Sequence, residues 1–147
     1  MAFPQAHVPE IAQVIQLSVA PVFLLAGLGA IINAMSTRLA RAIDRARALE
    51  TELPGADAAT TAKLHDELRT LSIRARLIGR AIALSVLCAL LVTVLITLAF
   101  VDAFLAADFS VLLAVVFIAA LAAFSGSLLV FLREIFMATA SLRIGPH

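Results

Sequence analysis

The stretch Ala81–Val101, AIALSVLCALLVTVLITLAFV, decides the fold because it is long, apolar and free of charged residues. About 20 such residues in a helix cross the roughly 30 Å hydrocarbon core of a bilayer. Two further uncharged runs, at about 11–35 and 111–132, meet the same requirement. The sequence therefore predicts an all-α membrane protein with three transmembrane helices, forming a single membrane domain over residues 1–147.

Charged residues are segregated around these three runs. All 11 Lys and Arg residues of the chain lie between the first and second runs or after the third. The other side of the runs holds only the acids Glu10, Asp102 and Asp108. Because cytoplasmic loops collect Lys and Arg, we expect a multi-pass protein with its amino terminus outside and its carboxyl terminus in the cytoplasm.

The segment between the first two runs, about 36–80, continues the helical pattern. Leu39, Ile43, Ala46 and Leu49 follow one another at spacings of three and four, and a similar series runs from Leu64 into the second run. Pro54-Gly55 is a strong turn signal between the two series. We expect a cytoplasmic antiparallel helical hairpin that extends about 27 Å beyond the bilayer.

The chain lacks the residue groups on which catalysis and ion-coupled transport depend. No Asp, Glu, Lys, Arg or His lies within the three runs, which argues against a proton relay. His7, His65 and His147 are far apart in sequence, and Cys88 is the only cysteine. We expect neither an enzyme nor a cofactor or metal site, because such sites need convergent partners.

The basic segment from Arg38 to Arg80 alternates Arg with Ala, Leu and acidic residues along a helical pattern. This arrangement favours contact with anionic lipid headgroups at the cytoplasmic face. It is not evidence for nucleic-acid binding.

One face of the first run differs from the rest of that helix. Residues seven apart, together with a companion row three residues on, are small or polar almost throughout. A seven-residue repeat keeps one helix face towards a partner helix. Gln13 and Gln16 need cover from lipid, supplied either by the other two runs or by another copy of the protein. We expect a homo-oligomer.

Two hypotheses follow for this face. In the first, several copies place it around a central axis as an ion channel or pore for ion transport, with an acidic outer ring, an apolar constriction and a basic inner mouth. The wall or oligomer interface would comprise Glu10, Gln13, Gln16, Ala20, Phe23, Gly27, Ala30, Ala34, Thr37, Arg38, Arg41 and Arg45. In the second, the face is a tight helix contact in a non-conducting scaffold or accessory subunit, which presents its cytoplasmic hairpin to a protein partner.

Several segments carry a family resemblance. They are the run from Pro21 to Asn33, the clusters Arg38–Arg41 and Asp44–Arg47, the stretch Arg74–Ile82 and the ending Phe131–Glu134. In these segments the chain resembles a family of bacterial membrane proteins catalogued as domain of unknown function 2721. The resemblance covers about 15–134. It implies a bacterial inner-membrane protein with three spans, and it implies no activity.

Overall fold

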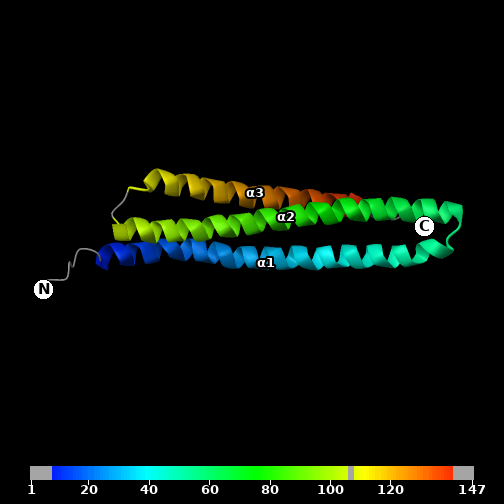
Figure 1. The fold of residues 1–147 in the computed structure, drawn as a ribbon, viewed down its shortest axis with the longest axis horizontal. Coiled ribbons are helices and arrows are strands. Elements are labelled where there is room, and N and C mark those ends of the chain that lie inside the picture. The colour runs from blue at the N-terminus through cyan, green and yellow to red at the C-terminus, as the bar shows by residue number, and fades with distance from the viewer. Residues whose placement is uncertain (1–7, 106–107, 141–147) are drawn as a thin grey trace. The chain divides into compact units, whose positions relative to one another are not determined.

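The computed structural model describes residues 8–105 and 108–140, and all of its regular structure is helical. Helix α1 covers Val8–Glu52, a short 3₁₀ turn η1 covers Leu53–Gly55, helix α2 covers Ala58–Leu105 and helix α3 covers Ser110–Ala140 (Figure 1). Each α-helix contains a stretch long and apolar enough to cross a membrane. The predicted all-α class with three such helices is therefore confirmed.

The turn between α1 and α2 lies where the sequence signals place it. Pro54 and Gly55 fall in η1, and α1 runs without a break from its apolar part up to Glu52. Asp57 comes directly before α2 and caps it: its carbonyl accepts a hydrogen bond from the Thr61 amide at 2.8 Å, and its Oδ1 accepts one from the Thr60 amide at 3.3 Å. An Asp in this position satisfies an otherwise free amide of the first helical turn.

Most of the buried side chains of each helix fall in one row whose members are seven residues apart. In α1 the buried row is Leu28, Met35, Ala42 and Leu49; in α2 it is Leu64, Leu71, Ile78, Ser85 and Val92; in α3 it is Ala120, Ser127 and Glu134. A strict heptad keeps one seam of a helix against its neighbours, as in coiled coils. Heptad packing is thus the rule from Leu28 to Leu49 in α1, from Leu64 to Val92 in α2 and from Ala120 to Glu134 in α3.

The chain divides into two compact units, and all three helices contribute to both. The first comprises residues up to Ile31 together with Leu84–Ser125 and is called the apolar unit below. The second comprises Ile32–Ala83 and the residues from Gly126 onward, and is called the charged unit. This division does not test the single membrane domain expected from the sequence, which stays a prediction.

The core of the apolar unit contains small residues. It is formed by Leu28 of α1, Cys88 and Val92 of α2, and Ala120 and Ala123 of α3. Alanine and cysteine at such positions let helix backbones approach closely, which is how helices associate where the hydrophobic effect between them is weak.

The core of the charged unit has an apolar part and a polar part. Ala42 and Leu49 of α1 pack with Leu64 and Leu71 of α2. The buried side chains of α3 in this unit are polar, and the hydroxyl of Ser127 donates a 2.8 Å hydrogen bond to the Ala81 carbonyl of α2. The second buried polar side chain from α3, Glu134, is central to the site described next.

Candidate functional site

The predicted face of α1 is exposed in the structure. Gln13, Gln16, Ala20, Phe23, Gly27 and Ala30 are all exposed in the apolar unit, as are Ala34 and Thr37 in the charged unit. Phe23 is 73% exposed, and a Cβ added at Gly27 would meet nothing within 4 Å. The sequence left open whether the other two helices or another copy of the protein shields this face from lipid. Within the described chain, the other helices of the protomer do not cover it.

The row of α1 that packs inside the protomer lies one position further along. Leu28 and Met35 are 1% and 0% exposed, whereas their neighbours Gly27 and Ala34 are exposed. One residue corresponds to about 100° around a helix, so the two rows point in different directions. Glu10 belongs to α1, but its side chain lies outside the described part of the structure.

The three arginines predicted for the inner end of this face have different surroundings. Arg38 is half-buried and lies 3.1 Å from Glu134. Arg45 forms an exposed 3.0 Å ion pair with Glu67 of α2. Arg41 is exposed and has no ion-pair partner among the described residues.

Glu134 of α3 is a fully buried carboxylate held by two guanidinium groups. Arg74 of α2 donates from Nε and Nη2 to Oε1, at 3.2 and 3.0 Å. Arg38 of α1 places Nη2 3.1 Å from Oε2, and its guanidinium lies 5.5 Å from the centre of the Phe131 ring. The Arg38 contact lacks hydrogen-bond geometry, so Oε2 has no hydrogen-bond donor in the described structure.

This triad joins all three helices of the charged unit through one carboxylate. A buried charge is tolerated only when it is paired, and the 0% exposed side chain of Glu134 receives a cation on each oxygen. Arg74 is the better placed of the two cations, because it makes two hydrogen bonds to one oxygen.

The site residues predicted from the sequence do not include Glu134 or Arg74. Glu134 falls just outside the third apolar run, which ends at about 132, and Arg74 belongs to the basic segment for which contact with anionic lipid headgroups is expected. The available signal was the heptad, since Glu134 follows Ser127 by seven residues and Ala120 by twice seven.

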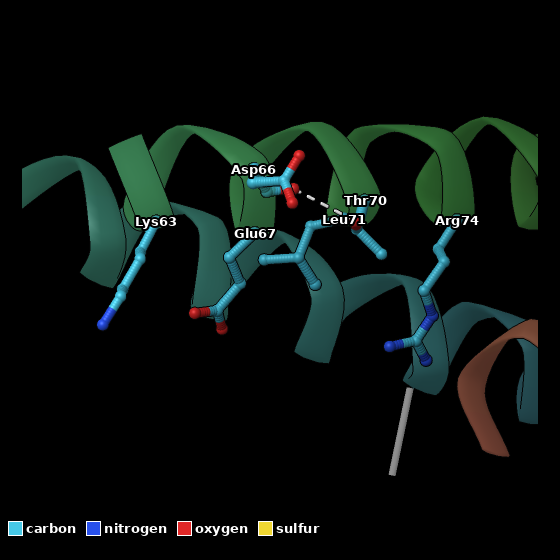
Figure 2. A pocket seen from close by; sticks show the side chains of 6 residues that line it. All are labelled: Lys63, Asp66, Glu67, Thr70, Leu71 and Arg74. Atoms are coloured by element: carbon cyan, nitrogen blue, oxygen red, sulfur yellow. Dashed lines mark hydrogen bonds between the residues drawn. The ribbon is translucent and has the colours of Figure 1, made fainter. Parts of the chain in front are cut away.

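Two cavities of the charged unit lie beside these ions. The first has a volume of about 340 Å³ and is lined by Arg38, Arg41, Ala42, Arg45, Leu71 and Arg74. The second, of about 450 Å³, is lined by Lys63, Asp66, Glu67, Thr70, Leu71 and Arg74. Figure 2 shows the second cavity, with the side chains of Lys63, Glu67 and Arg74 directed from α2 towards the ribbon of α1. The second cavity mixes both signs of charge, whereas every charged residue lining the first is an arginine.

A third hollow follows α1 and α2 in the same unit. Its volume is about 550 Å³, with an apolar floor that includes Ala42, Leu68 and Leu71, and charged residues that include Arg47 and Glu50. Among the described residues, no three His, Cys, Asp or Glu side chains group as ligands for a metal ion.

Comparison with known proteins gives a family but no individual relative. No curated protein and no solved structure matches the chain. The model of the family described as "Protein of unknown function (DUF2721)" matches residues 18–144, which include the whole of the charged unit's described helices and most of the apolar unit. With three apolar helices and a match over most of its length, this membrane protein belongs to that family.

Proposed function

We propose that the protein is a homo-oligomeric channel whose pore is lined by the exposed face of α1. The observation that carries the proposal is the exposure of Gln13 and Gln16 on a helix apolar enough to span a membrane. An amide transferred to hydrocarbon without a hydrogen-bond partner costs several kcal/mol, on the order of 2–7. Contact with water in a pore, or with another copy, removes that cost.

The order of residues along this face fits a gated pathway. From the amino-terminal end, the face passes from Gln13 and Gln16 through the exposed ring of Phe23 and the small residues Gly27 and Ala30. In this proposal the protein lies in a bacterial inner membrane. The basic end of the face, at Arg41, is then on the cytoplasmic side, because Lys and Arg accumulate on that side. Polar ends around an apolar constriction are the usual elements of a channel.

Cysteine cross-linking tests the assembly. Cys88, the only cysteine, is buried and is first replaced by alanine. We expect Gly27→Cys to form cross-linked dimers in native membranes and Gly29→Cys to form few. Both glycines are exposed and have no atom within 4 Å of an added Cβ, so neither substitution disturbs the protomer. Equal cross-linking at both positions, or a monomer by mass in nanodiscs, contradicts the assembly.

Ion flux tests conduction with the same matched pair. We expect the reconstituted protein to pass ions across liposome membranes, and Gly27→Leu to reduce the flux by about tenfold or more while Gly29→Leu leaves it near the wild-type rate. Absence of flux under voltage, tension and changes of pH or divalent ions excludes the pore and leaves the assembly standing.

One observation favours a second function, that of a non-conducting scaffold or accessory subunit. The 550 Å³ hollow between α1 and α2 combines an apolar floor with Arg47, Glu50, His65 and Arg69, which suits a helix of a cytoplasmic partner protein. Cross-linking from Arg69→Cys to a defined partner, combined with absent ion flux, supports this function over the channel. Neither function assigns the protein a catalytic residue, a cofactor or a nucleic-acid partner.

A further inference from the structure

Four arginines line a single open cavity in the charged unit. Arg38, Arg41 and Arg45 follow one another on α1 at spacings of three and four, and Arg74 reaches the same cavity from α2. Ala42 and Leu71, both buried, also line it. Its volume of about 340 Å³ falls within the range of small-molecule sites.

The arginines of this cavity are only partly neutralised by the protein. Glu134 accounts for one negative charge and Glu67 for another, against four positive charges, which leaves a net charge of +2. Arg41 contributes to this excess directly, because it has no acidic partner in the described chain. Like charges placed this close repel one another, and a bound anion removes the repulsion.

The chemistry of the cavity selects the kind of anion. A guanidinium presents a planar fork of N–H donors that matches two oxygens of a phosphate group. The side chains of Arg38, Arg45 and Arg74 are 37%, 54% and 23% exposed, and each is held in place by a carboxylate. A tetrahedral oxyanion with several acceptor oxygens can bridge such donors from both helices.

The position of the cavity along the chain indicates where such an anion is found. Arg38 is the first charged residue that follows the uncharged run of α1. Glu134, which pairs with Arg38, follows the uncharged run of α3 almost at once. The boundary between apolar and charged helix is the level of lipid phosphates in a bilayer.

We propose that Arg38, Arg41, Arg45 and Arg74 form a binding site for a phosphate-bearing anion, either the headgroup of an anionic lipid or a soluble phosphate. The site is complete within one protomer and does not depend on the channel. Glu134 positions Arg38 and Arg74, and Arg41 supplies the cation that is left for the ligand.

Thermal unfolding of the full-length protein in detergent tests this site. Cys88 is buried and is the only cysteine, so a thiol-reactive dye reports unfolding in a chain that has no Trp or Tyr. An anion that binds only the folded protein raises the unfolding temperature in a concentration-dependent way. One arm titrates inorganic phosphate against chloride at equal ionic strength, and the other compares phosphatidylglycerol with phosphatidylcholine in the micelles.

Arg41→Gln and Arg47→Gln form the matched pair. Both remove one exposed arginine from α1, but Arg47 does not line the cavity. We expect Arg41→Gln to raise the apparent Kd for whichever anion stabilises the protein by about tenfold or more, because one charge-assisted contact is lost. We expect Arg47→Gln to change that Kd by less than about twofold. A response to phosphatidylglycerol alone identifies a lipid headgroup, and a response to inorganic phosphate identifies a soluble ligand. No response in either arm, or an equal loss in both variants, overturns the proposal.

Discussion

The apolar and charged units use the same heptad but fill it with different chemistry. In the apolar unit the buried positions hold Leu28, Val92 and Ala120, which need nothing from one another except a close fit. In the charged unit the α3 heptad ends on Glu134, which requires a cation from each neighbouring helix. One unit gains its stability from packed area, and the other adds a requirement for exact pairing.

This difference indicates what each unit specifies. Apolar seams of similar residues tolerate small shifts of one helix along another, because every register buries comparable area. A buried carboxylate tolerates no shift, since moving Glu134 by one turn would leave an unpaired charge in the core. A single polar layer is known to fix register in coiled coils, and we infer the same role for this triad.

The largest expected effect comes from breaking the charged layer. Glu134→Gln removes the carboxylate and leaves Arg38 and Arg74 without their shared partner. We expect a loss of about 3 kcal/mol in the free energy of unfolding, measured in detergent through the exposure of Cys88. The matched control is Glu67→Gln, which breaks an exposed pair with Arg45 and should cost less than about 1 kcal/mol. Equal losses would mean that burial of Glu134 has no energetic consequence.

Replacing the whole triad separates stability from register. A variant carrying Arg38→Leu, Arg74→Leu and Glu134→Leu removes both signs of charge together. Such replacements of buried ion networks are often neutral or stabilising, so we expect an unfolding free energy within about 1 kcal/mol of the wild type or higher. Disulfide trapping between α2 and α3 then measures register: additional cross-linked positions support the specifying role, and a single unchanged position argues against it.

The next effect tests the close fit of the apolar unit. Ala120 is 1% exposed in the core, whereas Ala122 is exposed on the same helix. We expect Ala120→Leu to cost about 2 kcal/mol through overpacking, and Ala122→Leu to change the unfolding free energy by less than about 0.5 kcal/mol. A tolerated leucine at Ala120 would mean that this seam is loosely packed and that a close fit does not stabilise the apolar unit.

Sequence patterns predicted the parts of this fold that depend on neighbouring residues. The three apolar helices follow from local hydropathy, and the turn at Pro54-Gly55 follows from the backbone restrictions of those two residues. Glu134 was not recognised from local patterns, because its contact with Arg74 spans 60 positions and a charge after an apolar run looks like the end of a span. Its seven-residue spacing from Ser127 was the signal that the sequence offered. The exposed row of α1 was recognised as distinctive from its composition, but only the packing of Leu28 and Met35 shows that the row faces away from the protomer's own helices.

A smaller effect concerns the buried hydroxyl of Ser127, which ties α3 to α2. Ser127 is buried and donates to the Ala81 carbonyl at 2.8 Å, while Ser125 is exposed. We expect Ser127→Ala to lower the unfolding free energy by about 0.6–1 kcal/mol and Ser125→Ala to leave it unchanged. Thermal unfolding of both variants measures the difference, and a stabilised Ser127→Ala would show that close packing outweighs this bond.

The smallest effect lies at the start of α2 and depends on pH. Hydrogen bonding with the Thr60 side chain, followed by the backbone amides nearby, holds the pKa of Asp57 below its ordinary value of 3.8. Because the folded pKa is the lower one, this stabilisation is complete above pH 3.8 and is lost as the pH falls through the folded pKa. Asp57→Ala should therefore lower the unfolding temperature slightly at neutral pH and lose this difference in strong acid. Thr60→Val removes the side-chain hydrogen bond that lowers the pKa of Asp57 most. In that variant the stabilisation from Asp57 should therefore be lost at a higher pH than in the wild type. If both variants keep a constant difference from the wild type at every pH, the cap at Asp57 does not stabilise the charged unit through its carboxylate.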